Sequence, residues 1–432
     1  KGSVYAAVSS EPFDGDEERY GGRGMIQAVE NANVVLADVL LGKDPTHQLA
    51  IDKLLSCDTD LATNVVTAAS IACCKAGAKQ TMTPLSGYIG AMCNNSEVAI
   101  PSTAFSIING GQLSASPLWV QDILIIPTAD VETISERLLL ASTVHRALEI
   151  TSRDAGQGHL HRGPRGGFCN DSCTFENLMN CLMTSLEITG FLEHVEIMVD
   201  VHASRLLPPR KEERSEQDEK RKESRGLYNL KTFAADTGAI ELTSAHDLFD
   251  IYVEWLEKYP ITALIEPFAT TDVATSKDLL VLGNQILDGK ITASGKTLRE
   301  RRVSVSAEEA PNDSHPDKGA GIEDVSLFRI VADESVSTSA QLDLDEEQGA
   351  NAVMISTAKL TTLSDSIALS TKASELGWVV VVSAVSEEEM EGDFLTELSV
   401  GLKAEQLLMG GLRSTNAVAA CVRLARLEGD GV

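Results

Sequence analysis

The sequence predicts an α/β fold in which a mostly helical N-terminal part precedes a barrel of strands and helices. From about Ala99 onward, short apolar strands alternate with amphipathic helices, and strands separated by helices pair in parallel. The number of these repeats in a chain of 432 residues favours a closed barrel. An open, doubly wound sheet is the competing interpretation. No Gly-x-Gly-x-x-Gly sequence follows a strand, so the dinucleotide-binding version of that sheet has no support.

The first 96 residues are expected to be mostly helical. Gly24–Leu41 carries apolar residues at helical spacing, and Leu61–Ala78 is rich in small residues that let a helix pack closely against a neighbour. The sequence Thr83-Pro84-Leu85 ends the second helix, because proline cannot continue one.

The rest of the chain supplies the expected barrel elements. The predicted strands are Ala104–Ile108, Ile123–Pro127, Val195–Val201, Thr262–Ile265, Phe328–Ala332, Ala352–Ile355 and Val379–Ser383. The predicted helices between them are Val131–Ile150, Asn177–Thr189, Ser244–Lys258, Leu363–Leu376 and Glu397–Leu407. Two charged insertions, near residues 205–226 and 288–324, interrupt the rhythm and are expected to face solvent.

The composition restricts the classes of partner. The chain has 36 Lys and Arg against 64 Asp and Glu, a net charge of −28, which repels nucleic acid and anionic lipid and suits protein partners. No apolar run approaches the roughly 18–20 residues that a membrane helix needs. The eight cysteines are scattered, several of them in apolar helical sequence, which indicates reduced thiols in a cytoplasmic protein.

Several motifs, in order along the chain, resemble the enolase family. They are Phe105–Gly111 (FSIINGG), Tyr259-Pro260, Ile265–Phe268 (IEPF), Ile330–Glu334 (IVADE), Leu398–Lys403 and Gly410–Ser414. The resemblance implies an N-terminal α+β domain over residues 1–96, here without its first strands, and an α/β barrel over residues 97–432. That barrel is expected to begin with two antiparallel strands and two helices. Family members are typically dimers that interconvert 2-phosphoglycerate and phosphoenolpyruvate with magnesium.

The resemblance places three magnesium ligands at strand ends, since magnesium requires hard oxygen ligands to stabilise the dianion formed in this reaction. Asp200 fits the first position, Ile265 stands at the second, and Glu334 stands at the third, where the family has Asp. An isoleucine cannot coordinate a cation. We therefore expect magnesium binding to be lost.

The other functional positions of the family also carry different residue types here. The replacements are Ser356 for the base lysine, Arg165 for the acid partner, Val385 for the phosphate-binding arginine, Leu408 for the lysine that holds the substrate carboxylate, and Leu113 for a histidine. Lys359 is three residues beyond Ser356, and residues 10–14 (SEPFD) replace the mobile serine loop. Gln121 and Asp122 remain as remnants of the site. Because losing one electrostatic group costs about 10²–10³ in rate, so many losses predict an inactive protein.

A structural or binding role is therefore the leading hypothesis. The sequence Ala263–Phe268 (ALIEPF) is similar to the divergent sperm-flagellar branch of the family, which suggests a ciliary or flagellar axoneme, with axonemal proteins or a second enolase-like chain, in a homodimer or heterodimer, as partners. A residual phosphopyruvate hydratase and a barrel with changed chemistry are the alternatives.

Three further sequence features allow two interpretations each. A zinc site at His159, His161, Cys169 and Cys173 is not expected, because the spacing matches no standard pattern. His202 could point into the barrel mouth or bond a backbone group. Residues 387–391 (EEEME) suit a helix start, and a docking patch for a basic partner is the alternative.

Overall fold

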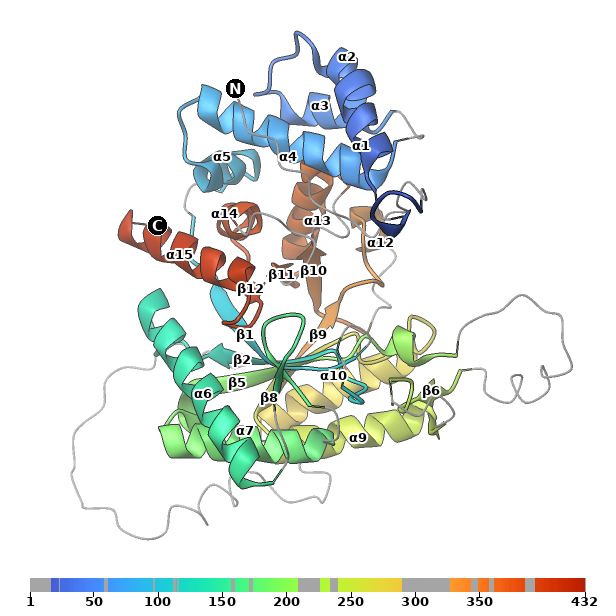
Figure 1. Ribbon diagram of the computed structural model, residues 1–432, viewed down its shortest axis with the longest axis vertical. Helices are drawn as coiled ribbons and strands as arrows, with labels where there is room; N and C mark the ends of the chain where they lie inside the picture. Colours follow the sequence, from blue (N-terminus) through green and yellow to red (C-terminus); the bar gives the residue numbers. More distant parts are fainter. Residues whose placement is uncertain are drawn as a thin grey trace, which may run out of the picture.

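The computed structural model of the chain describes residues 17–22, 24–57, 61–95, 98–111, 114, 116–156, 160–170, 174–208, 226–233, 240–289, 327–342, 349–356, 361–384 and 393–431. The two charged insertions fall almost entirely outside these ranges. In Figure 1, the N-terminal helices lie at the top of the molecule and the strands of the barrel lie below them.

The N-terminal part is helical where it is described. Its elements are η1 (Tyr20–Gly22), α1 (Ile26–Asn31), the π-helical turn η2 (Ala32–Leu36), α2 (Ala37–Leu40), α3 (Gln48–Leu55), α4 (Thr63–Gln80) and α5 (Leu85–Met92). The predicted helix over Gly24–Leu41 is therefore a run of α1, η2 and α2. Pro84 directly precedes α5 and sets its start, after α4 has ended at Gln80. Leu36, Ile51 and Leu55 are among the residues of a small core of this part.

Eight strands form the closed barrel that the sequence predicts. They are β1 (Ser102–Asn109), β2 (Asp122–Pro127), β5 (Val195–Asp200), β8 (Ile261–Ile265), β9 (Arg329–Ala332), β10 (Ala352–Ser356), β11 (Val379–Ser383) and β12 (Gln406–Met409). The last strand pairs in parallel with the first, from Ser102 opposite Gln406 to Phe105 opposite Met409, and this pairing closes the sheet. Strand β2 is antiparallel to both of its neighbours, β1 and β5, so the expected antiparallel start is confirmed.

The helices that surround the barrel follow the predicted pattern, with one correction. They are α6 (Ile134–Asp154), α7 (Phe175–Thr189), α9 (Ala245–Lys258), α10 (Val273–Leu287), α12 (Ser339–Leu342), α13 (Leu363–Glu375), α14 (Asp393–Leu402) and α15 (Thr415–Gly429). The helix predicted over Glu397–Leu407 is wrong at its end, because α14 stops at Leu402 and β12 follows. Lys403 has a φ of +57°, a left-handed conformation that ends the helix.

Short elements complete the molecule. They are the hairpin β3 (His161–Arg162) and β4 (Phe168–Cys169), the hairpin β6 (Tyr228–Asn229) and β7 (Leu242–Thr243), and the 3₁₀ turns η3 (Leu192–His194) and η4 (Ala203–Leu206). Strand β4 pairs with β1, which attaches the first hairpin to the barrel at its mouth.

The interior of the barrel is apolar. Its cluster of buried side chains comprises Ala104, Leu124, Ile126, Met198, Ala263, Ile265, Val331, Ala352, Met354, Val381 and Leu408. Side chains two residues apart on a strand share a face, so these residues show which positions of each strand face the interior. The interior is thus a packed core rather than a channel.

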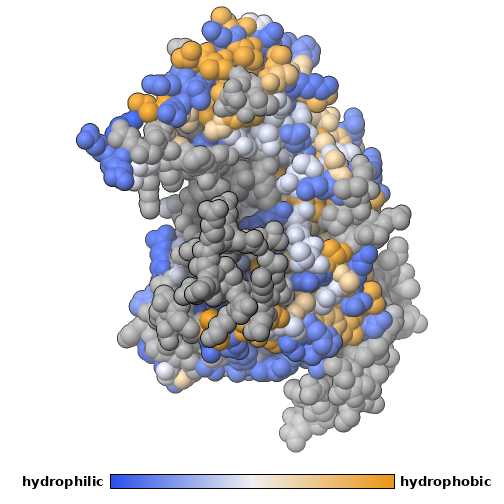
Figure 2. Space-filling model, turned by 90° about the vertical axis from the view of Figure 1, so that its right-hand side faces the viewer, coloured by the Kyte–Doolittle hydropathy of each residue, from blue (hydrophilic) through white to orange (hydrophobic). Residues whose placement is uncertain are grey.

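The N-terminal helices dock on the barrel through buried polar contacts. Both oxygens of the buried Asp52 carboxylate accept hydrogen bonds, from Ser70 Oγ (2.7 Å) within the N-terminal part and from Ser364 N (2.9 Å) in the first turn of α13. The buried Glu397 of α14 accepts a hydrogen bond from Ser86 N of α5 at 2.9 Å. The N-terminal part also has apolar residues on its surface. Figure 2 shows orange residues at the top of the molecule. Ile26, Val29, Val34 and Leu41, in and directly after α1, η2 and α2, are exposed.

Candidate functional site

The candidate site lies at the mouth of the barrel, where β5 ends in the buried Asp200. Asp200 Oδ2 accepts a hydrogen bond from Arg165 Nη1 at 2.9 Å, and Asp200 Oδ1 lies 2.5 Å from His202 Nδ1. Burial alone would raise the pKa of Asp200, but His202 and Arg165 together hold it below its usual range. Asp200 is therefore an ionised carboxylate with a cationic partner at each oxygen.

His202 lies between two carboxylates. Its Nε2 atom is 2.8 Å from Asp333 Oδ2, so both ring nitrogens face carboxylate oxygens. Burial opposes the charge on the ring, but Asp200 and Asp333 raise the pKa of His202 to about 10. The imidazole ring is thus a cation at neutral pH, and it joins the ends of β5 and β9.

The backbone of the loop that carries Arg165 is fixed by hydrogen bonds to Asn109 and Gly411. Asn109 Oδ1 accepts hydrogen bonds from Arg165 N (3.2 Å) and Gly167 N (3.0 Å), and Gly411 N donates to Arg165 O at 2.7 Å. Gly166 has a φ of +83°, and a Cβ there would lie 2.5 Å from Gly411 O, so only glycine fits at this crossing. The loop thus fixes the backbone from which the Arg165 guanidinium reaches Asp200.

Asp122, a remnant named from the sequence, is the second acid beside Arg165. Its Oδ2 atom lies 3.7 Å from Arg165 Nη1, and its Oδ1 atom accepts hydrogen bonds from Ser106 Oγ (2.7 Å) and Asn109 Nδ2 (3.0 Å). Burial raises the pKa of Asp122 to about 7, although Arg165 opposes this increase. Gln121, the other remnant, is also buried.

The end of β8 offers no carboxylate to the mouth. Ile265 is fully buried in the apolar interior cluster. Glu266, the acid that follows it, has a φ of +46°, and its Oε1 atom accepts hydrogen bonds from Asp333 N (2.8 Å) and Ser335 N (2.9 Å). Glu266 therefore caps the end of β9 and does not replace the missing ligand.

The structure brings Asp333, rather than Glu334, next to Asp200 through His202. The Glu334 side chain is 45% exposed and accepts a hydrogen bond from Arg205 Nη2 at 2.9 Å, on the rim of the mouth. Neither Asp333 nor Arg205 is among the site residues predicted from the sequence. The alternation of side chains along a strand could have indicated Asp333, because Val331 faces the interior and the residue two positions later shares that face.

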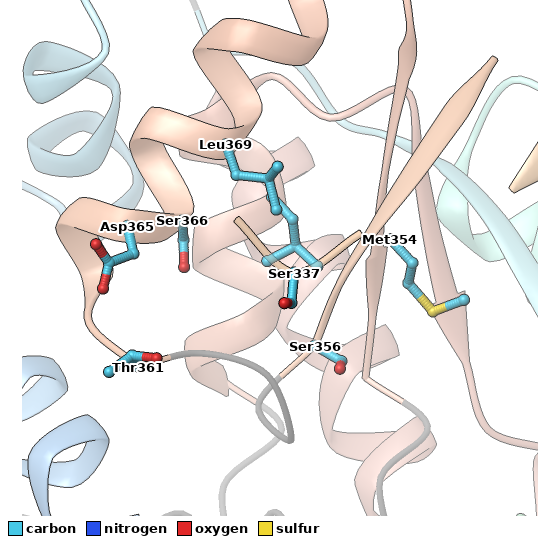
Figure 3. Close-up of a pocket in the computed structure, with 8 residues that line it drawn as sticks. Ser337, Met354, Ser356, Thr361, Asp365, Ser366 and Leu369 are labelled. Atoms are coloured by element: carbon cyan, nitrogen blue, oxygen red, sulfur yellow. The ribbon is translucent and has the colours of Figure 1, made fainter. Parts of the chain in front are cut away.

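Ser356 ends β10 and lines a small pocket (Figure 3). Ser337, Thr361, Asp365, Ser366 and Leu369 line it as well. The cavity measures about 10 Å³, which is room for about one water molecule, whereas small-molecule sites usually measure about 300–1,000 Å³. Among the residues that the structure describes, no lysine or arginine lines this pocket. Leu408, named from the sequence as a replaced lysine, lies in the apolar interior.

Several sequence-predicted residues lie outside the described residues: Leu113, Val385, Lys359, residues 10–14 and residues 387–391. Of the four residues considered for zinc, His159 and Cys173 also lie outside. The exposed His161 stands opposite the buried Cys169 in the hairpin of β3 and β4. Within the described ranges, no group of three His, Cys, Asp or Glu residues is arranged to hold a metal ion.

None of the helices in the described part of the chain is both long and apolar enough to cross a bilayer.

Comparison with known proteins assigns both parts of the chain. A family model described as "Enolase, C-terminal TIM barrel domain" matches residues 97–303 and 305–431, and one described as "Enolase, N-terminal domain" matches residues 3–89. "Enolase" from Mastigamoeba balamuthi is 26% identical over 423 residues, which cover 96% of this chain and 84% of that protein. "Enolase" from Eimeria tenella is 26% identical over 443 residues, covering 98% and 86%. "Enolase 1" from Entamoeba histolytica is 26% identical over 438 residues, with the same coverage.

Proposed function

The chain belongs to the enolase family, and from this premise we propose that it is a non-catalytic member that serves as a structural or binding subunit. One observation carries the proposal: Ile265 and Leu408 are packed into the apolar interior of the barrel. The family resemblance requires a metal ligand at the first position and a substrate-binding lysine at the second. A metal-binding carboxylate and a substrate-binding lysine are thus replaced by the aliphatic side chains of Ile265 and Leu408.

The position of the catalytic base supports the same proposal. Ser356 ends β10 where the resemblance requires a lysine, and the pocket beside it is lined by hydroxyl groups, one carboxylate and apolar side chains. A hydroxyl group is far too weak a base to remove a proton next to a carboxylate. Since one lost electrostatic group costs about 10²–10³ in rate, two independent losses lower the rate by about 10⁴–10⁶.

The charge at the barrel mouth also opposes a phosphorylated substrate. Among the described residues, the mouth holds three basic side chains, Arg165, Arg205 and His202, beside four acids, Asp122, Asp200, Asp333 and Glu334. Each of the three basic side chains faces a carboxylate of the mouth at 2.8–2.9 Å. An incoming trianion would therefore compete with these carboxylates for every basic side chain described there.

A coupled assay for phosphoenolpyruvate formation tests the proposal. The purified chain is incubated with 2-phosphoglycerate and Mg²⁺, beside an ordinary enolase as the positive control. We expect a rate at least about 10⁴-fold below that of the control. A rate within about a hundredfold of the control would overturn the proposal.

The partners that we propose are other proteins, and the setting that we propose is a ciliary or flagellar axoneme. The motif Ala263–Phe268 supports the setting, and the exposed apolar residues on the N-terminal helices support protein contacts. Cross-linking mass spectrometry on native ciliary material tests both. Cross-links from these helices to axonemal proteins are expected, and a chain found free of any partner would contradict the role. Sedimentation of the purified chain tests for the dimer that the resemblance implies.

A further inference from the structure

We infer that the side chains of His202 and Arg165 take the position of the divalent metal at the barrel mouth, so that they occupy the carboxylates there and exclude the metal. The inference rests on the proposed function only for the location of the metal position. It would stand for any activity at this mouth that uses no divalent ion.

Both oxygens of the carboxylate best suited to a metal already face nitrogen atoms of other side chains. Asp200 Oδ2 accepts a hydrogen bond from Arg165 Nη1 at 2.9 Å, and Asp200 Oδ1 faces His202 Nδ1 at 2.5 Å. Hydrogen bonds of this length to an ionised carboxylate are strong. A metal ion that approached Asp200 would have to displace the Arg165 guanidinium or the His202 ring.

His202 also bridges two carboxylates, as a bound metal ion would. Its two ring nitrogens face Asp200 of β5 and Asp333, which follows β9. The side chain is only 4% exposed, so its departure would leave two carboxylates without this partner.

The position of His202 is fixed by the backbone. The residue has a φ of +49°, which is uncommon for a residue other than glycine and persists only where its surroundings enforce it. Here Arg205 N donates to His202 O at 3.0 Å, and Ala203 N donates to Glu266 O at 2.9 Å. Together with the hydrogen bonds that fix the loop of Arg165, these contacts hold both side chains at the mouth in defined positions.

The residues present therefore do not fit a magnesium ion. The second ligand position is the fully buried Ile265, which has no oxygen to offer. The Arg165 guanidinium is always charged, so a metal ion beside Asp200 would also meet electrostatic repulsion from it.

Manganese, a paramagnetic substitute for magnesium, tests the inference. Mn²⁺ binding is measured by electron paramagnetic resonance on the full chain, on Asp200→Asn, and on the double variant His202→Ala/Ile265→Glu, which removes the ring and supplies a third carboxylate. The acidic surface binds Mn²⁺ weakly everywhere, so the comparison between variants decides. We expect Asp200→Asn to match the unaltered chain, and the double variant to gain a site at least about tenfold tighter, equivalent to about 1.4 kcal/mol.

A thermal melt keeps the test decisive if the double variant is poorly folded. The melting temperature of the unaltered chain is expected to be the same with EDTA and with Mn²⁺, while that of the double variant rises with Mn²⁺. A tight Mn²⁺ site in the unaltered chain that disappears in Asp200→Asn would overturn the inference. So would a double variant that neither binds Mn²⁺ nor is stabilised by it. These readouts are independent of phosphoenolpyruvate formation, so the inference and the proposed function can fail separately.

Discussion

Replacing Asp52 with alanine should loosen the N-terminal helices from the barrel. The Asp52 carboxylate is 2% exposed and accepts hydrogen bonds from Gln48 Nε2 (2.9 Å), Ser70 Oγ (2.7 Å), Ser364 N (2.9 Å) and Ser364 Oγ (2.6 Å). The two bonds from Ser364 lie in the first turn of α13, where the helix dipole also stabilises a negatively charged group. The alanine variant therefore loses an anchor between the two parts of the chain.

The magnitude follows from these contacts. A hydrogen bond to a charged group contributes about 1.5–3 kcal/mol, and the four bonds share one carboxylate, so their contributions do not simply add. The variant also leaves the partly buried Ser364 N–H group without its acceptor. We expect a loss of about 3–5 kcal/mol, a large part of the roughly 5–15 kcal/mol that stabilises most folded domains.

Urea unfolding followed by two signals is the measurement. All three tryptophans, Trp119, Trp255 and Trp378, belong to the barrel part, so their fluorescence follows the barrel, whereas circular dichroism follows the helices of both parts. In Asp52→Ala the dichroism should begin to fall at lower urea than the fluorescence. Asp44→Ala is the matched control, because Asp44 is exposed and its carboxylate accepts hydrogen bonds from Thr46 and Gln80, which both belong to the N-terminal part. If Asp52→Ala and Asp44→Ala both unfolded like the unaltered chain, the anchoring role of Asp52 would be refuted.

Three further predictions follow from buried groups elsewhere. Glu397→Gln should lower the free energy of unfolding in urea by about 3 kcal/mol, because Glu397 is buried against Arg423 and accepts a hydrogen bond from Ser86 N; an unchanged midpoint would contradict this. Gly166→Ala should cost about 1–3 kcal/mol more than Gly156→Ala, since both glycines have positive φ but only Gly166 would place a Cβ within 2.5 Å of another atom; equal losses would exclude the clash. His145 is stacked 4.0 Å from Phe168, and its pKa is lowered to about 4, first by burial and then by Arg413. Because the unfolded state binds the proton more tightly, the stability from neutral His145 is complete above about pH 6.5 and is lost as the pH falls towards 4, by at most about 3 kcal/mol. His145→Phe should flatten that part of the profile, and parallel profiles would contradict the assignment.

The sequence predicted the barrel well because its strands alternate with amphipathic helices, but it missed β12. That strand has four residues, all buried, and it follows α14 after only three residues, so its apolar side chains continue the helical pattern. A strand buried on both faces shows no polar alternation that could distinguish it from a helix end. Its parallel pairing with β11 on one side and with β1, over 300 residues away, on the other defines it as the eighth strand.

The candidate site was predictable in part. Asp200, Ile265 and Arg165 lie at the mouth or in the interior below it, where the family motifs put them. The motif alone could not show which acid of the Asp333–Glu334 pair faces inward, because that depends on strand register. Nor could it show that His202 bridges two carboxylates, because a left-handed residue after a strand end leaves no periodic signal.

The parallel pairing of β1 with β12 has a consequence during protein synthesis. Phe105 pairs with Met409, so the ribosome must make over 300 further residues after the first strand before the ring can close. Contact between parts so distant in sequence makes folding slow and leaves sheet edges open until the last strand arrives. A nascent chain cut short before β12 would expose both edges and be prone to aggregation, so the barrel is completed only after β12 has left the ribosome.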